Sequence, residues 1–110
     1  MPLSRRARIE VYLVVDNSAE YKLLLDAIQR EFIVTFGGCT VIRGAKGLYL
    51  SRSGSVDADD IDLIYTDTPF AVDADSDRLS AYTDSLKAAL LEATQEESIL
   101  IAVHEIFHSV

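Results

Sequence analysis

Two histidines are the side chains of this chain best suited to acid–base chemistry near neutral pH. His104 and His108 are four residues apart, close to the C-terminal end. On a β-strand they share one face but are separated by about 13 Å, at about 3.3 Å per residue. A histidine nitrogen lies only about 2 Å from a metal ion that it binds. The two histidines alone therefore do not predict a metal site.

A neighbouring strand can supply the partners that the histidines lack. If the last predicted strand pairs with the first, His104 or His108 can approach Arg8, Glu10 or Tyr12. A cluster of these side chain types on the outer face of a sheet can bind an anion or transfer protons. The alternative, which we prefer, is that both histidines are hydrogen-bonded and inert at a strand end or an interface. Under the cluster reading, the candidate ligand-binding residues are Glu10, Tyr12, His104 and His108. No catalytic residue is assigned.

An aspartate-rich segment partly matches a calcium-binding loop. Residues 73–77 read Asp-Ala-Asp-Ser-Asp, and Asp84 follows eleven positions after the first of them. The sixth position of such a loop requires glycine, but Arg78 occupies it here. Acidic residues are also favourable in the first turn of a helix. We therefore interpret this segment as the start of a helix rather than a metal site.

Further aspartates surround a predicted third strand, and a close pair of them can bind Mg²⁺ or act as an acid–base pair. Asp60 and Asp62 alternate with Ile61 and Leu63, as in a strand with one solvated face. We interpret the carboxylates as solvent-facing and predict no metal ion and no cofactor. The aspartates concerned are Asp57, Asp59, Asp60, Asp62 and Asp67.

The single cysteine and the glycines do not indicate catalysis. Cys39 rules out an internal disulfide framework, and we expect it to be a buried structural thiol. Gly37-Gly38 and the segment 44–47 lack the strand–loop–helix context of a phosphate-binding loop, because a strand follows each of them. These glycines predict turns and a bulge.

The charge of the chain is strongly negative and uneven. The formal net charge is −8, and residues 56–110 carry thirteen acidic against two basic residues. This balance argues against nucleic-acid binding, although the acidic segment 57–77 leaves open an alternative in which the chain binds a basic partner. We interpret the basic run at residues 5–8 as a frayed, solvated terminus. No export signal or membrane-length apolar stretch is present, which predicts a soluble cytoplasmic protein and no membrane partner.

The hydrophobic pattern predicts one domain over residues 1–110 with the order β-α-β-β-α-β. Predicted strands cover about 8–15, 39–50 with a bend, 61–66 and 98–108, and predicted helices cover 18–33 and 76–94. Asn17 is the expected N-cap of the first helix, with Glu20 completing a capping box. The order favours an α+β, ferredoxin-like two-layer sandwich, with an antiparallel sheet and two helices on one face.

The first and last strands predict an assembly. Both are apolar at nearly every position, so both of their faces should be buried. Two helices can cover only one face, which leaves the other for a second copy of the chain and favours a homodimer. The expected outer-face residues are Tyr12, Val14, Leu100, Ala102 and Ile106; those expected beneath the helices are Ile9, Val11, Leu13, Ile99, Ile101 and Val103, with the facing of the last strand left open.

Two segments carry a resemblance to known sequences. Residues 36–49 read FGGCTVIRGAKGLY and residues 95–100 read QEESIL. This layout resembles small uncharacterised bacterial families, some of them cyanobacterial, with a ferredoxin-like fold. The resemblance implies that fold and assigns no activity to any residue.

These observations predict a homo-oligomeric module that binds a small ligand or a protein partner. The alternative is a small enzyme with a pocket on the sheet face. That enzyme would use His104 or His108 together with Glu10 and Tyr12.

Overall fold

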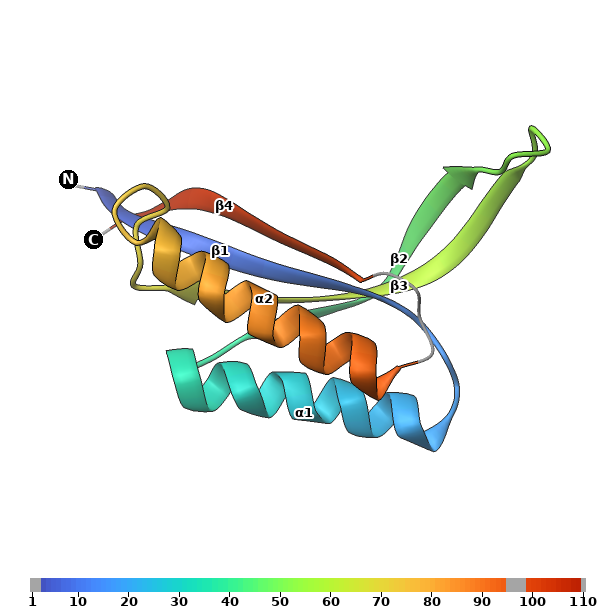
Figure 1. Cartoon of the computed structure of the whole chain (residues 1–110), viewed down its shortest axis with the longest axis horizontal. Coiled ribbons are helices and arrows are strands. Elements are labelled where there is room, and N and C mark those ends of the chain that lie inside the picture. The colour runs from blue at the N-terminus through green and yellow to red at the C-terminus, as the bar shows by residue number, and fades with distance from the viewer. Residues whose placement is uncertain (1–2, 95–98, 110) are drawn as a thin grey trace.

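The computed structural model describes residues 3–94 and 99–109, and it confirms the predicted ferredoxin-like α+β sandwich (Figure 1). Four antiparallel strands lie in the order β2-β3-β1-β4. Both helices lie on one face of the sheet, and the other face carries no helix. The elements are β1 (Leu3–Val14), α1 (Ala19–Phe36), β2 (Thr40–Leu50), β3 (Val56–Thr68), α2 (Ser76–Ala93) and β4 (Leu100–Ser109).

Strand alternation builds the core between the sheet and the helices. In β1 every second residue from Ala7 to Leu13 is buried, because successive side chains of a strand point to opposite faces. The helix α1 contributes four buried side chains to this core, spaced three or four residues apart on one side: Tyr21, Leu25, Ile28 and Phe32. The residues predicted beneath the helices are in this core or pack against it: Ile9, Val11, Leu13, Ile99, Ile101 and Val103.

The even-numbered residues of β1 and β4 point to the helix-free face of the sheet. This defines which face of the last strand packs under the helices, a point that the sequence left open. Tyr12 and Leu100 are register partners across the β1–β4 pair, and Leu100 is 60% exposed. The five residues predicted for this face all have that parity: Tyr12, Val14, Leu100, Ala102 and Ile106.

The basic run near the N-terminus is not frayed, so that prediction is wrong. β1 begins at Leu3 and pairs with β4 over the whole run. Ala7 is fully buried between the arginines. Arg5 lies near two carboxylates, those of Asp73 at 3.5 Å and Glu105 at 3.4 Å. Strand pairing and charge pairing therefore order this segment.

The helix ends follow local capping chemistry. Ser18, and not Asn17 as predicted, is the N-cap of α1: its hydroxyl accepts a hydrogen bond from the Tyr21 backbone N–H at 3.1 Å. Asp75 is the N-cap of α2 by position, but its side chain makes no capping hydrogen bond to the helix. Its carboxylate instead accepts from the Ala71 N–H in the preceding loop at 2.9 Å. The start of α2 at Ser76 confirms that the aspartate-rich segment begins a helix. No helix among the described residues is long and apolar enough to span a membrane.

The hairpin of β2 and β3 continues past the rest of the sheet. A bulge lies between Ile42 and Ala45, where Gly44 has a φ of +82° that favours glycine. Val14, the last residue of β1, pairs with Ile61. Residues 46–59, which we call the arm, extend beyond this point as a two-stranded ribbon (Figure 1).

Asp62 corrects the prediction that the carboxylates of β3 are solvated. Asp62 is only 1% exposed, because it shares the helix-facing side of β3 with Ile64. The Tyr21 hydroxyl donates a hydrogen bond to Asp62 Oδ2 at 2.7 Å, and Arg43 Nη2 lies 3.3 Å from the same oxygen. Asp60, by contrast, is exposed and pairs with Lys46. The buried carboxylate thus fastens the start of α1 to β3.

Removing the Tyr21 hydroxyl should therefore lower the free energy of unfolding more than removing a tyrosine hydroxyl that donates to an exposed carboxylate. Burial and Asp62 raise the pKa of Tyr21, so its hydroxyl stays protonated as a donor. Tyr21→Phe should lower the free energy of unfolding by about 2–3 kcal/mol, because it leaves a buried charge short of a partner. The matched control Tyr82→Phe removes a 3.0 Å bond to exposed Glu31 and should cost less than about 1 kcal/mol. Urea denaturation measures both, and equal losses would contradict the role of Asp62.

Candidate functional site

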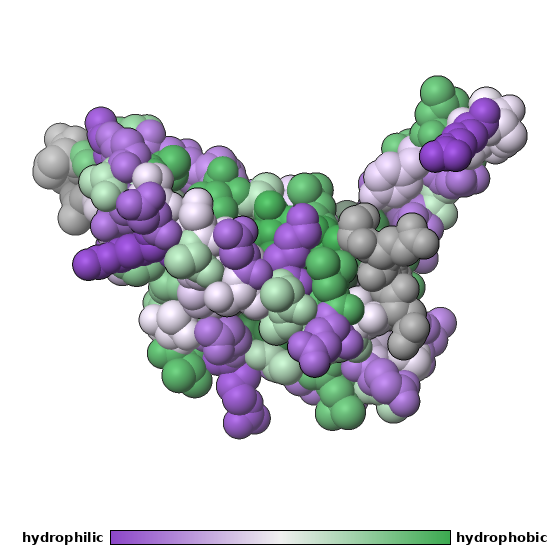
Figure 2. Space-filling view, viewed as in Figure 1, coloured by the Kyte–Doolittle hydropathy of each residue, from purple (hydrophilic) through white to green (hydrophobic). Residues whose placement is uncertain are grey.

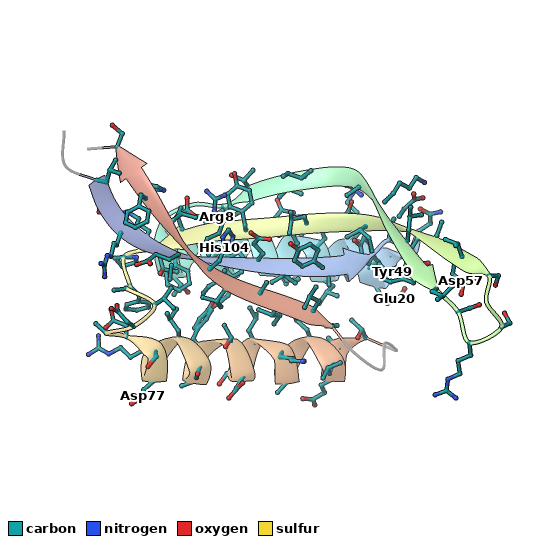
Figure 3. The ribbon with its side chains drawn as sticks, turned by 90° about the horizontal axis from the view of Figure 1, so that it is seen from above. Arg8, Glu20, Tyr49, Asp57, Asp77 and His104 are labelled. Carbon is teal, nitrogen blue, oxygen red and sulfur yellow. The ribbon has the colours of Figure 1, made fainter. Side chains whose placement is uncertain are left out.

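The candidate site lies on the helix-free face of the sheet, where β1 runs between β3 and β4. Arg8 is the register partner of Asp67 on one side and of His104 on the other. Figure 3 shows Arg8 and His104 near each other on this sheet, away from the arm. The next outward-facing residue of β1 is Glu10, and Tyr12 follows it. Alternation along one strand therefore places three polar side chains in a line.

Glu10 is the centre of the first part of the site. Its side chain is only 12% exposed. The Tyr12 hydroxyl donates to one carboxylate oxygen at 2.5 Å, and His104 Nε2 contacts the other oxygen. Burial acts to raise the pKa of Glu10, but the hydrogen bonds from Tyr12 and His104 and the nearby positive charge outweigh it and lower the pKa below its usual range. Glu10 is therefore a carboxylate at neutral pH.

Asp67 is the centre of the second part. Arg8 donates two hydrogen bonds to its carboxylate, at 2.7 and 3.1 Å, and His108 Nε2 lies 3.0 Å from it. The Arg8 guanidinium also lies 4.0 Å from the centroid of the Tyr65 ring, in a cation–π contact. The hydrogen bonds from Arg8 are the main reason why the pKa of Asp67 is lowered.

The structure divides the four predicted residues between these two centres. Glu10, Tyr12 and His104 meet in one cluster, whereas His108 contacts Asp67 instead. Sequence reasoning counted Asp67 among solvated carboxylates and did not select it. It is 59 residues from Arg8 in the chain, so only the β1–β3 register reveals the pair.

The arrangement is well suited to holding charge and less suited to binding a metal ion. Glu10 contacts Tyr12 and His104, and Asp67 contacts Arg8 and His108. Both carboxylates stay anionic. Within residues 3–94 and 99–109 no three His, Cys, Asp or Glu side chains are placed to hold a metal ion. Tyr12 also borders a hollow of about 440 Å³ between the start of α1 and the end of α2. The cluster itself forms an open surface on the sheet.

Comparisons with protein-family models, with curated proteins and with solved structures give no match for this chain. The resemblance of residues 36–49 to bacterial families therefore stays a prediction. Any function has to be argued from the geometry of the helix-free face.

The paired carboxylate of Asp67 makes stability depend on pH. A carboxylate with a lowered folded-state pKa stabilises the fold above its unfolded-state pKa of about 3.9, and this contribution is lost as pH falls through the folded value. Asp67→Asn should therefore lower the free energy of unfolding by about 1–3 kcal/mol near neutral pH. The difference from wild type should shrink below about pH 4.

Urea denaturation across this pH range measures the effect. Asp73→Asn is the matched control, because the Asp73 side chain is exposed and its ion pair with Arg5 is long, at 3.5 Å. The hydrogen bond that Asp73 Oδ1 accepts from the Ala74 N–H can also be accepted by an amide oxygen, so this change should alter stability by less than about 0.5 kcal/mol. A difference between Asp67→Asn and wild type that does not change with pH would show that the charge of Asp67 is not what stabilises the fold.

Proposed function

We propose that this chain is a self-associating binding module whose copies stack the helix-free faces of their sheets. One observation carries the proposal: a row of apolar and aromatic side chains crosses all four strands on this face. Ile42, Leu63, Tyr12 and Leu100 are successive register partners from β2 to β4. Both ends of the row are open, since Ile42 is 45% and Leu100 60% exposed. Burying this row is favourable in proportion to the apolar area removed from water.

The size of the face supports a second copy as its cover. Four strands spaced about 4.8 Å apart and about ten residues long span about 600 Å². A stable protein–protein interface buries about 800 Å² on each partner. The face is thus a large part of an ordinary interface. A dimer is favoured because a two-fold axis lets the same surface serve both subunits.

The charge of the face also supports self-association. Within the four-stranded part of this face, Arg6 and Arg8 balance Glu10 and Asp67, so the fixed charges cancel there although the whole chain carries −8. Asp57 and Asp59 continue the same face of β3 but lie in the two-stranded arm. Two strongly acidic molecules repel each other least where they are locally neutral. A basic partner would favour the acidic surfaces elsewhere, so this observation supports a second copy over the basic partner.

Stacking two such faces would enclose the Glu10 cluster. Glu10, Tyr12, His104 and His108 would then line the space between subunits, together with Arg8. Charged and polar groups in an enclosed space interact more strongly than in water. We propose that a small polar ligand binds there, in the assembled protein.

A small enzyme is the second candidate, and the contacts of Glu10 with His104 and Tyr12 favour it. A carboxylate can orient an imidazole for proton transfer. The lowered pKa of Glu10 suits that positioning role and not proton transfer by Glu10 itself near neutral pH. The module therefore ranks first.

Charged residues placed at either end of the apolar row should prevent assembly. Leu100→Asp and Ile42→Asp should each weaken self-association at least tenfold, about 1.4 kcal/mol. The matched control is Leu23→Asp on α1, where Leu23 is 69% exposed, and it should leave association unchanged. Sedimentation velocity over a range of protein concentrations measures all three variants.

A wild-type chain that stays monomeric at tens of micromolar would refute the module. NMR of the His104 ring separates the two candidates when small carboxylic acids and phenols are added. Shifts that occur only in the assembled wild type support the module, and shifts that persist in the monomeric Leu100→Asp variant support a pocket on one subunit.

A further inference from the structure

The arm, residues 46–59, turns a charged surface toward the helix-free side of the sheet. It lies past the last β1–β3 pair, so two strands continue there without a third. Figure 1 shows the arm bending away from the helices, over the helix-free face. Strand alternation and the β2–β3 register put four of its residues on the same side as Leu63. We call these four the inner face of the arm: Gly47, Tyr49, Asp57 and Asp59.

The inner face of the arm carries two carboxylates that have no partner within the described part of the chain, those of Asp57 and Asp59. The surface beneath them is preformed. The Tyr49 ring lies over Gly47, so closely that a Cβ on residue 47 would collide with it. A preformed element loses little conformational entropy on binding. The arm therefore presents two unpaired negative charges on an ordered ribbon.

Arg6 is the complementary charge, at the opposite end of the same face. Among the residues that the structure describes, no carboxylate pairs with its guanidinium, and its Nε is buried without a hydrogen-bond partner. Arg8, the next outward-facing residue of β1, already donates to Asp67. Figure 3 shows Tyr49 and Asp57 at the end of the sheet away from Arg8. A buried donor without an acceptor is unfavourable, so Arg6 lacks a partner that its own chain does not supply.

The strand register places these unpaired charges symmetrically. Val11 and Ile64 are partners in the antiparallel β1–β3 pair. Arg6 precedes Val11 by five residues and Asp59 precedes Ile64 by five, so the two charges lie about 17 Å from this pair in opposite directions. The apolar row is one residue away from the same pair. A two-fold axis that crosses the strands here stacks the rows of two copies and carries Asp59 of one copy to the end that holds Arg6 of the other.

We infer that a second copy of this chain stacks on the helix-free face with its strands running in the opposite direction, and that the arm carboxylates of each copy pair with Arg6 of the other. The inference rests on the proposed function and adds the orientation of the two copies. Stacked sheets lie about 10 Å apart, and the bend of the arm narrows this gap at the ends. Figure 2 shows the surface hollowed between the arm and the opposite end of the sheet, where that copy sits.

Charge decides between this stacking and the other two-fold arrangement of the same faces. An axis along the strands brings both arms to one end of the dimer, where Asp57 and Asp59 of the two copies repel each other, and brings both Arg6 side chains to the other end. An axis across the strands replaces these repulsions with a pair of opposite charges at each end.

The area of the contact also fits this arrangement. The inner face of the arm spans about 150 Å². Together with the four-stranded part of the face, it approaches the roughly 800 Å² that a stable interface buries on each partner. The arm alone is too small to hold a separate protein.

Exchanging the two charges tests the pair. Arg6→Glu and Asp59→Arg each place like charges opposite each other and should raise the dissociation constant of self-association at least about tenfold. The combined variant Arg6→Glu/Asp59→Arg restores opposite charges in exchanged positions, so its dissociation constant should return to within about threefold of wild type. Sedimentation velocity gives the dissociation constants, and circular dichroism checks that the melting temperatures are unchanged.

The matched controls make the same charge changes on exposed positions of α2. Lys87→Glu and Asp84→Arg should change the dissociation constant less than about twofold. They separate the proposed contact from the effect of net charge, because Asp59→Arg makes the chain less acidic and by net charge alone would strengthen association.

Arg6→Gln and Asp59→Asn repeat the test without reversing a charge, in case Arg6→Glu lowers the melting temperature. Each removes one partner of the pair, so the two losses should not add in the double variant. Additive losses, wild-type assembly of Asp59→Arg, or a combined charge exchange that fails to restore assembly overturns the arrangement. Each of these outcomes leaves the stacked faces standing and the arm carboxylates open to a different, basic partner. A monomeric wild type overturns both proposals.

Discussion

The central position of β1 constrains the rest of the structure. The strand is hydrogen-bonded on both sides, to β3 and to β4. One of its faces packs in the core and the other lies on the helix-free side of the sheet. Ile9 and Val11 are fully buried beneath the helices, while Arg8 and Glu10 between them face outward. Because side chains alternate with a period of two, a slip of one residue would exchange these faces. The same pairing therefore specifies both the core and the candidate site.

The core in turn depends on how the helices attach to the sheet. α1 packs Phe32 and its neighbours on β1 and β3, and its first turn is tied to β3 by the Tyr21–Asp62 hydrogen bond. A buried carboxylate is tolerated only where donors satisfy it, so this contact also restricts where α1 can begin. With both helices held on one side, the other face of the sheet stays open.

That open face combines two kinds of surface. Its centre is a set of paired charges, in which Arg8, Glu10 and Asp67 have partners on neighbouring strands. Beside it lies the apolar row that ends at Ile42 and Leu100. Paired charges inside an interface contribute more to specificity and register than to affinity, whereas apolar area supplies the driving force. A partner bound here would therefore be held by the row and oriented by the charges.

Local pattern alone was enough to predict much of this protein. The element order, the alternation in β1 and the helical spacing of α1 each depend on residues close together in the sequence. The approach of His104 to Glu10 also follows once the first and last strands are neighbours. The ends of the elements were less predictable, and the N-cap fell on Ser18 instead of the adjacent Asn17.

Tertiary structure decided the features that depend on distant partners. Asp62 looks solvated in the sequence and is buried, because Tyr21 lies 41 residues away and only the fold brings its hydroxyl there. The same is true of the ordered arginines of β1 and of Asp67, whose pairs depend on strand register. Periodicity reports which face a residue occupies, but the free energy of a buried or paired charge depends on the groups opposite it. Those groups are set by the register of the sheet, which no short stretch of this sequence contains.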